Sequence, residues 1–281
     1  MMKKILEMNH ITMQFGGLIA VNDFHNQLYE GELLGLIGPN GAGKTTAFNV
    51  ITGIYIPTKG KVIFDGIDIT PFRPHEITHL GIARTFQNIR LFQDMTVLEN
   101  VIVAQHHMLS NSDVDKIMKK HGKNPKGSSP MWFIKALTKI GYLSKEKEMI
   151  KEGLLLLEKV GLLHLAEEKA SALPYGLQRK LEIARALATH PKVLLLDEPA
   201  AGMNPQESEE LMHFIRKIRD EFNLSILLIE HDMKVVMGVC ERILVLDYGA
   251  IIAEGKPEEI QKNPRVIEAY LGEEWKNAKA E

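Results

Sequence analysis

A short stretch near the N-terminus has the glycine spacing of a phosphate-binding loop. It lies between an apolar run, Leu33–Ile37, and a segment, Thr45–Thr52, that can begin a helix. Its residues are Gly38, Pro39, Asn40, Gly41, Ala42, Gly43, Lys44, Thr45 and Thr46. Glycines let the backbone curl so that N–H groups point at phosphate oxygens, and the helix adds the positive end of its dipole. The spacing predicts a nucleoside triphosphate site, with Lys44 at the β- and γ-phosphates and Thr45 on Mg²⁺. A glycine-rich turn without a ligand is the alternative.

Two carboxylates, Asp197 and Glu198, end a second apolar run, Val193–Leu196. In a fold with such a loop, this strand lies beside the strand that feeds the loop. Asp197 is then placed to hold the Mg²⁺ shell, and Glu198 faces the γ-phosphate. A carboxylate there can orient and deprotonate the attacking water. The alternative is that the acidic pair only caps a strand. Together with the loop, the pair predicts nucleotide hydrolysis.

The bulk composition fits one α/β core that carries a subdomain. The chain has 281 residues, and 45% of them are hydrophobic, which is ample for a core. A formal charge of −2 excludes a global field that attracts nucleic acid or anionic lipid. The single cysteine, Cys240, excludes an intramolecular disulfide and fits a reducing cytoplasm. No apolar stretch reaches the roughly 18 residues that span a bilayer, and the N-terminus lacks the apolar region of a signal peptide. We therefore expect a soluble chain that stays inside the cell.

Hydrophobic periodicity divides the chain into strand-rich and helix-rich parts. Strand signals occur at Ile5–Met13, Leu18–Leu28, Lys61–Phe64, Val193–Leu196, Ser225–Ile229 and Arg242–Leu246. An Asp65-Gly66 turn follows the third of these, and helical patterns beside the last three argue for a parallel sheet. Helical periodicity runs from about Thr96 to Leu165, and residues 124–130 form a breaker-rich loop within it. We expect a core with an N-terminal β subdomain at residues 1–86 and 175–255, a helical subdomain with an insertion at 87–174, and a tail at 256–281.

A third motif, Leu173–Leu187, is a turn that opens an amphipathic helix. It resembles the ABC signature, usually Leu-Ser-Gly-Gly-Gln, and with the other motifs the chain is identified as a member of the ABC ATPases. Here Pro174 replaces the serine, Tyr175 the first glycine and Leu177 the glutamine. Proline is compatible with a helix N-terminus but has no hydroxyl for the γ-phosphate, so the Gly176 backbone and the helix dipole remain as phosphate contacts. The resemblance implies that five residues contact the nucleotide of another subunit: Pro174, Tyr175, Gly176, Leu177 and Gln178.

Four further residues fall where this family places functional groups. Gln87 matches the Q-loop glutamine, which contacts Mg²⁺ and lies by the membrane subunit. His231 matches the switch histidine, which bonds the γ-phosphate. Asn204 stands in the D-loop, where aspartate is commoner, and Phe15 stands where the family stacks an aromatic ring on adenine. A lone histidine or aromatic residue at a strand end is usually structural, but the ordered set of motifs favours the functional interpretation.

Several stretches look like the ATP-binding subunit of branched-chain amino acid importers. They are residues 15–21, 81–87, 175–176, 198–205, 229–238 and 263–272. The resemblance implies an α/β P-loop core with a mostly parallel sheet, an antiparallel β subdomain and a helical subdomain. It also implies ATP and Mg²⁺ as cofactors and a head-to-tail homo- or heterodimer with a similar ATPase. Two membrane permeases would hold the chain at the inner face of the membrane, and an extracytoplasmic binding protein would be an indirect partner.

Other functions remain open at this point. A related importer for urea or short amides and a lipopolysaccharide exporter share much of the core. A soluble ABC ATPase of DNA repair or of the ribosome belongs to another class, but such proteins generally carry two modules or long coiled coils. Pro174 and Leu177 also motivate a module that binds ATP without hydrolysing it. The transported substrate is not specified by this chain, because the permease and binding protein select it.

Overall fold

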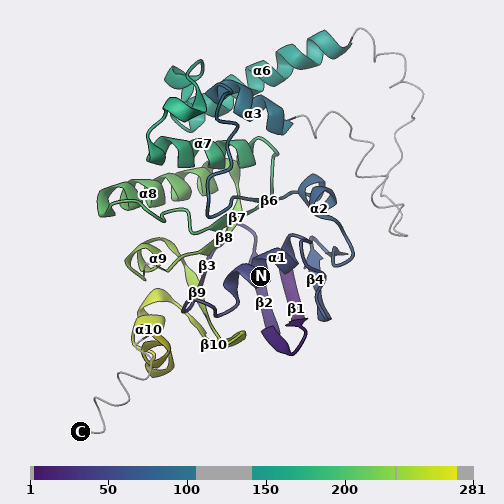
Figure 1. The fold of residues 1–281 in the computed structure, drawn as a ribbon, viewed down its shortest axis with the longest axis vertical. Coiled ribbons are helices and arrows are strands. Elements are labelled where there is room, and N and C mark those ends of the chain that lie inside the picture. The colour runs from purple at the N-terminus through teal and green to yellow at the C-terminus, as the bar shows by residue number, and fades with distance from the viewer. Residues whose placement is uncertain (1–2, 106–140, 232, 271–281) are drawn as a thin grey trace. The chain divides into compact units, whose positions relative to one another are not determined.

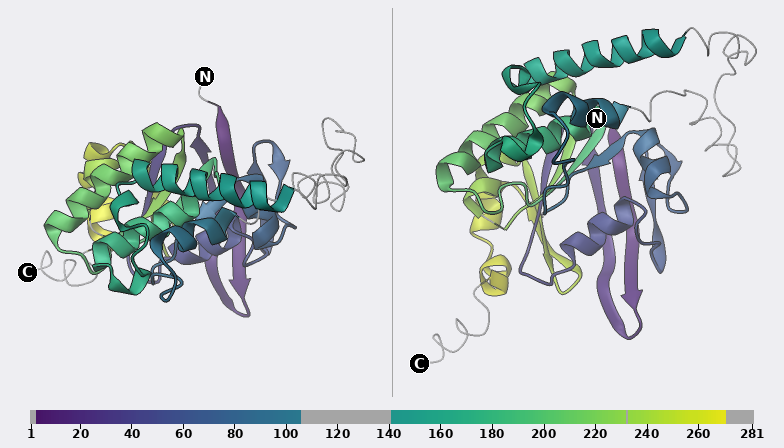
Figure 2. Two further views of the ribbon diagram at one scale, coloured as in Figure 1. Left: turned by 90° about the horizontal axis from the view of Figure 1, so that it is seen from above. Right: turned by 45° about the horizontal axis from the view of Figure 1, so that its top comes forward.

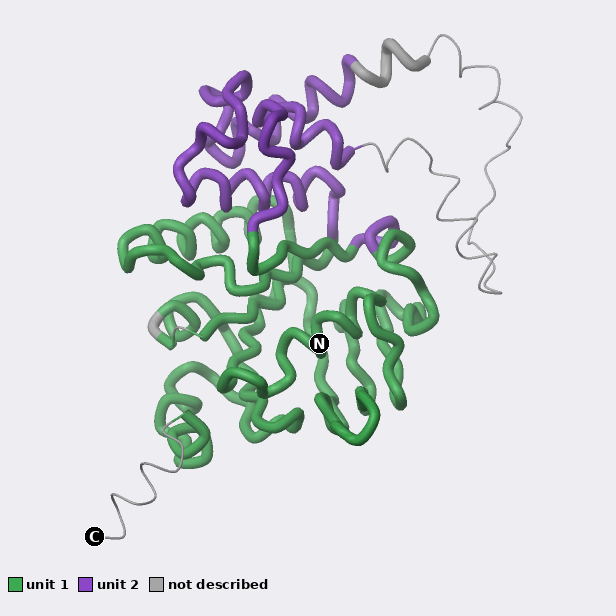
Figure 3. The backbone as a smooth tube through the Cα atoms, viewed as in Figure 1, with its two compact units in different colours: residues 1–77, 82–88, 192–281 green, residues 78–81, 89–191 purple. Residues whose placement is uncertain are grey.

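The computed structural model describes residues 3–105, 141–231 and 233–270. Figure 1 shows the fold, and Figure 2 shows it from two further sides. The chain divides into two compact units, coloured in Figure 3. Unit 1 comprises residues 1–77, 82–88 and 192–281, and unit 2 comprises residues 78–81 and 89–191. The breaker-rich loop predicted at residues 124–130 lies outside the described residues, and the domain boundaries expected from the sequence stay predictions.

Unit 1 is built on a six-stranded sheet with the order β10-β9-β3-β8-β7-β6. Its strands are β3 (Leu33–Ile37), β6 (Ile82–Arg84), β7 (Val193–Asp197), β8 (Ser225–Ile229), β9 (Arg242–Asp247) and β10 (Ala250–Gly255). Neighbouring strands are parallel except β10, which runs antiparallel to β9. Every residue of β3, β7 and β8 is buried, as central parallel strands covered on both faces require. The predicted mostly parallel sheet is confirmed. The expectation that β7 lies directly beside β3, the strand that feeds the glycine-rich loop, is wrong, because β8 pairs with both and lies between them.

A second sheet of unit 1 is antiparallel, with the order β2-β1-β4-β5. Its strands are β1 (Lys4–Phe15), β2 (Leu18–Tyr29), β4 (Lys59–Phe64) and β5 (Ile67–Asp68). Asp65 and Gly66 join the last two strands with φ angles of 46° and 78°, the left-handed conformation that tight hairpins need. The antiparallel subdomain and the turn are confirmed. The two-residue strand β5 carries too short a pattern to be predicted.

Helices cover both faces of the parallel sheet. Those of unit 1 are α1 (Lys44–Ile51), α8 (Pro205–Phe222), α9 (Met233–Val239) and α10 (Pro257–Gln261), and residues 264–270 are also helical. Figures 1 and 2 place α8, α9 and α10 along one face and α1, with the antiparallel sheet, along the other. Asn204 begins α8 with a capping box, because its side chain accepts from the Glu207 N–H at 2.9 Å and the Glu207 carboxylate accepts from the Asn204 N–H at 3.0 Å. The predicted D-loop asparagine is thus the N-cap of a long helix.

Unit 2 is helical, and α2 (Pro74–Leu80) crosses into it from unit 1. Its other helices are α3 (Val97–Gln105), α6 (Gly141–Lys159) and α7 (Tyr175–Leu187), with short 3₁₀ turns at Leu163–Leu165 and Ala170–Ala172. α3 packs on α6 and α7. The fully buried side chain of Asn100 fixes the turn before α3, since it exchanges hydrogen bonds of 2.9 and 3.0 Å with the Phe92 backbone. Within the part of the chain that is described, no helix is both long and apolar enough to cross a membrane.

Candidate active site

The glycine-rich loop connects β3 to α1, as predicted, and its glycines are sterically required at two positions. Gly38 has φ 151°, and a Cβ atom there would lie 2.0 Å from the Leu246 carbonyl oxygen. Gly43 has φ 101°, and a Cβ atom would lie 2.3 Å from the Ala20 carbonyl oxygen. Gly41, with φ 80°, faces open space. The first N–H groups of α1 have no partner inside the helix, so the loop presents donors and a positive helix end to an anion.

Lys44 lies inside this loop with only 6% of its surface exposed. Its Nζ donates to the carbonyl oxygens of Gly38, at 2.7 Å, and Pro39, at 2.9 Å. Burial lowers the pKa of Lys44, while the negative charges of Glu198 and Asp197 oppose that shift. The ammonium group therefore already sits where the loop curls, held by neutral carbonyl groups that a phosphate can replace.

Asp197 ends β7 with 4% of its surface exposed, so its carboxylate is almost fully removed from water. Its Oδ2 accepts a hydrogen bond of 2.7 Å from Nη2 of Arg84, the last residue of β6. β6 and β7 are parallel neighbours, with Arg84 opposite Leu195, which brings the two side chains to the same edge of the sheet. A buried carboxylate needs a charged or hydrogen-bonding partner, and here the guanidinium provides it.

Glu198 follows directly in a left-handed conformation, with φ 45°. Its backbone N–H donates to the Ile229 carbonyl at 2.9 Å, which fixes the turn after β7 against the end of β8. One carboxylate oxygen, Oε2, accepts from Nε2 of Gln87 at 2.8 Å and lies 3.6 Å from Nδ1 of His231. The sequence predicted that Glu198 acts on the attacking water, Gln87 on Mg²⁺ and His231 on the γ-phosphate. Gln87 and His231 both lie beside the same oxygen atom of Glu198, although Gln87 is 111 positions away from Glu198 along the chain.

A buried carboxylate, Glu230, supports the backbone around His231. Its Oε1 accepts from the Ala200 N–H at 2.8 Å, and its Oε2 accepts from the His231 N–H at 3.3 Å. Glu230 is 1% exposed, and burial raises its pKa. Because one side chain binds both segments, Glu230 fixes the backbone at Ala200 against the backbone at His231.

Phe15 lies at the end of β1 with 41% of its surface exposed. Its ring meets the edge of Tyr55 at a centroid distance of 5.2 Å and an interplanar angle of 78°. Tyr55 follows α1 and its N–H donates to the Asn49 carbonyl, so the ring is tied to the phosphate-binding segment. An exposed aromatic ring held by a second one can stack on a nucleobase.

The signature segment belongs to unit 2, where it begins α7 as predicted. Pro174 is the N-cap residue, and an added Cβ atom at Gly176 would meet nothing within 4 Å. Fully buried Arg179 donates to Glu182 at 2.7 Å and to the Tyr175 hydroxyl at 3.1 Å. The apolar face expected to pack inward is buried at Leu181, Ile183, Ala184 and Leu187. The segment therefore presents an open helix end on a rigid base.

The residues present fit a magnesium nucleotide. Thr45 is exposed at the start of α1, and Asp197 and Gln87 add a carboxylate and an amide oxygen. Mg²⁺ prefers such hard oxygen ligands and is usually held by one or two carboxylates together with phosphate oxygens and water. Among the described residues, no group of three or more His, Cys, Asp or Glu side chains is placed to hold a metal alone. Nucleotide phosphates would supply the remaining oxygens.

Sequence reasoning missed two residues of this site, Arg84 and Glu230. Both stand inside stretches quoted for their resemblance, but neither received a role. Arg84 pairs with an acidic residue 113 positions away, and Glu230 with a backbone group 30 positions away. A charged residue at the end of an apolar strand was the available signal, because such a residue needs a buried partner.

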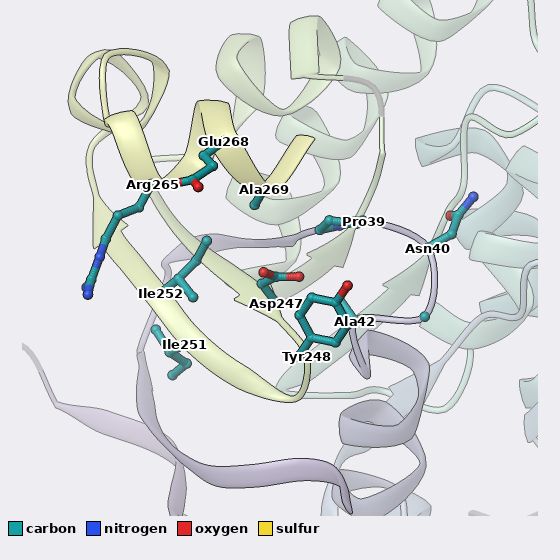
Figure 4. Close-up of a pocket in the computed structure, with 11 residues that line it drawn as sticks. Pro39, Asn40, Ala42, Asp247, Tyr248, Ile251, Ile252, Arg265, Glu268 and Ala269 are labelled. Atoms are coloured by element: carbon teal, nitrogen blue, oxygen red, sulfur yellow. The ribbon is translucent and has the colours of Figure 1, made fainter. Parts of the chain in front are cut away.

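The outer side of the glycine-rich loop borders a cavity of about 750 Å³. Asp247, Tyr248, Ile251 and Ile252 of the β9–β10 hairpin line it together with Arg265 and Ala269 of the tail. In Figure 4, Asp247 and Tyr248 lie near Pro39 and Ala42, and the Arg265 side chain points away from the loop. Asp197 and Glu198 are not among the lining residues, whereas Pro39–Ala42 of the glycine-rich loop are.

Comparison with known proteins identifies this arrangement. Residues 21–201 match the family described as ABC transporter, and residues 250–276 match the one described as branched-chain amino acid ATP-binding cassette transporter. The chain is 45% identical over 274 residues to the high-affinity branched-chain amino acid transport ATP-binding protein BraF of Pseudomonas aeruginosa, covering 97% of this chain and 100% of BraF. It is 44% identical over 273 residues to LivG of Escherichia coli, a protein of the same description, with the same coverage. A crystal structure of the ADP conformation of an ATP-binding cassette of an ABC transporter matches with a TM-score of 0.78 and 32% identity, covering 96% of this chain and 99% of that one.

Proposed function

The chain belongs to the ABC transporter family of ATPases, and from that premise we propose that it energises an importer of branched-chain amino acids. The similarity to BraF and LivG runs over nearly the whole chain and includes the C-terminal segment that matches a branched-chain amino acid cassette. The observation that carries the ATPase part of the proposal is the convergence of Lys44, Gln87, Asp197, Glu198 and His231 within unit 1. These five groups are the side chains of this chain that would bind the phosphates and cleave a nucleoside triphosphate.

Each residue then has a separate task. Lys44 exchanges its carbonyl partners for β- and γ-phosphate oxygens, and Phe15 stacks on the adenine. Glu198 accepts a proton from the attacking water, while Gln87 and His231 orient that carboxylate and the γ-phosphate. Thr45, Asp197 and Gln87 would hold Mg²⁺, which neutralises phosphate charge when it is bound.

The second half of the site comes from another subunit. The open helix end at Pro174–Gln178 is suited to a phosphate, and we propose that it completes the nucleotide site of a partner ATPase. Pro174 supplies no hydroxyl there, so in a heterodimer the two sites are unequal. Closure of the ATPase dimer on ATP would move two integral membrane permeases, which also hold the chain at the inner face of the membrane. An extracytoplasmic binding protein would deliver the substrate.

Nucleotide binding tests the first step. We expect Lys44→Ala to abolish binding of ATP by the purified chain, because the loop loses the only side-chain cation placed in it among the described residues. Lys61→Ala is the matched control, since Lys61 lies on β4 with 68% of its side chain exposed. Retained ATP affinity in Lys44→Ala would refute the phosphate cradle.

Capture from native membranes tests the partners. Polytopic permeases that co-purify with the tagged chain, and a binding protein stabilised by leucine, isoleucine or valine, would support amino acid import. Stabilisation by urea or short amides would move the function to the related importer. Co-purification with lipopolysaccharide export proteins, ribosomes or DNA would refute the proposed function.

A further inference from the structure

Arg84 is a buried cation that touches three of the segments forming the nucleotide site. Its side chain is 7% exposed. Nη2 donates to Oδ2 of Asp197 at 2.7 Å, and Nη1 donates to Oδ1 of Asn49, also at 2.7 Å. Asn49 lies on α1, the helix that follows the glycine-rich loop. One rigid guanidinium therefore joins the end of β6, the end of β7 and α1.

Two aromatic rings hold the same guanidinium in place. Its central carbon lies 5.5 Å from the ring centroid of Phe48 and 5.0 Å from that of Phe86. Both distances fall within cation–π range. Phe48 belongs to α1, and Phe86 immediately precedes Gln87. The contacts that orient Arg84 therefore come from the phosphate-binding helix on one side and from the Q-loop on the other.

We propose that Arg84 is the positioning residue for Asp197, holding one carboxylate oxygen so that the other is available to a nucleotide-bound divalent cation. The proposal rests on the proposed function. A carboxylate that is 4% exposed cannot keep its orientation through water, so its direction depends on its protein partner. Partners that orient a ligand typically change metal affinity by tenfold to hundredfold when they are replaced.

Lysine cannot replace arginine in this role. A guanidinium is a planar fork that donates to Asp197 and Asn49 at once and stacks between two rings, whereas an ammonium is a single point charge on a flexible stem. Arg84→Lys keeps the charge beside Asp197 and removes only the geometry. The variant therefore separates orientation of the carboxylate from neutralisation of its charge.

The test measures nucleotide affinity of the full chain as a function of Mg²⁺ concentration, with a fluorescent ATP analogue as the probe. The midpoint is the Mg²⁺ concentration at which the nucleotide affinity has gained half of its Mg²⁺-dependent increase. We expect Arg84→Lys to raise this midpoint by about tenfold. The affinity measured in EDTA should change by less than about threefold, because the loop and Lys44 are untouched. Arg219→Lys is the control, since Arg219 lies on α8 in a surface ion pair with Glu241.

An equal loss of affinity with and without Mg²⁺ would overturn the proposal, because it would make Arg84 a general support of the fold. An unchanged Mg²⁺ midpoint would overturn it as well. In an Asp197→Asn background, Arg84→Lys should cause no further shift, and an additive shift would refute action through Asp197.

Asn49→Ala carries the same test if Arg84→Lys does not fold. It leaves the ion pair intact and frees one edge of the guanidinium, so the Mg²⁺ midpoint should rise by about threefold, which is less than for Arg84→Lys. No change in that midpoint would count against the proposal. The proposal rests on the nucleotide-binding part of the proposed function, and failure of that part is separately visible, because the unmodified chain would then bind no nucleotide even in EDTA.

Discussion

Alanine substitutions at Gly41 and Gly43 separate backbone strain from steric collision within the glycine-rich loop. Both glycines have positive φ, at 80° and 101°, so either substitution places an L-residue in a left-handed conformation at a cost of about 1–2 kcal/mol. A Cβ atom at position 41 meets open space, whereas one at position 43 lies 2.3 Å from the Ala20 carbonyl oxygen. That collision displaces backbone atoms, which should add about 1–3 kcal/mol.

The assay is thermal unfolding of the full chain. At about 2–4 °C per kcal/mol for a large domain, Gly43→Ala should melt roughly 2–12 °C below Gly41→Ala. Gly17→Ala controls for glycine replacement itself, because Gly17 has no left-handed φ and open space around its Cβ position. Gly43→Ala should also lose ATP affinity, since the displaced residue is the N-cap of α1. Equal melting temperatures for Gly41→Ala and Gly43→Ala would refute the packing argument.

Three further predictions concern other parts of unit 1, each measured by urea unfolding. Burial raises the pKa of Glu230, so the folded chain binds the carboxyl proton more tightly than the unfolded chain does. The free energy of unfolding should therefore fall as pH rises from about 4.5 through the raised pKa. Glu230→Gln should lose this part of the pH dependence, and an unchanged pH profile would contradict the raised pKa of Glu230. Asn204→Ala should cost about 1 kcal/mol by removing the cap of α8, while Asn204→Asp should not. Arg242→Ala removes the two hydrogen bonds of 2.7 and 3.0 Å that the guanidinium donates to the Glu32 carboxylate, which then keeps, among the described residues, only the Tyr29 N–H at 2.9 Å, and it should cost about 2 kcal/mol. A loss no larger than that of Lys61→Ala would contradict the pairing.

The central strands could be predicted because the signal for each one lies within its own few residues. β3, β7 and β8 are short and almost entirely apolar, as strands buried on both faces require, and each was found within one residue of its expected bounds. The start of α1 followed from the loop motif in the same way. By contrast, β6 has three residues and carries no periodicity, so it becomes a strand only through its pairing with β7.

The contacts within the site depend on pairs of residues that are far apart in sequence. The motifs indicated that Gln87, Glu198 and His231 belong to one site, yet their meeting at one carboxylate oxygen follows only from the parallel order of the strands. The sequence gives no role to Arg84, which stands within residues 81–87, because its partners come from α1 and β7. The roles of the signature residues depend on a second subunit and stay predictions.

ATP-driven leucine uptake by the assembled complex tests the central claim most directly. The complex, with its permeases and binding protein, is reconstituted into vesicles with this chain either unmodified or carrying Glu198→Gln. We predict that the variant complex still binds ATP, while its hydrolysis and leucine uptake each fall at least tenfold, because the water loses its general base. Glu258→Gln, an exposed position on α10, should leave both rates unchanged. Unchanged hydrolysis and uptake in Glu198→Gln, or no uptake of any branched-chain amino acid by the unmodified complex, would contradict the account.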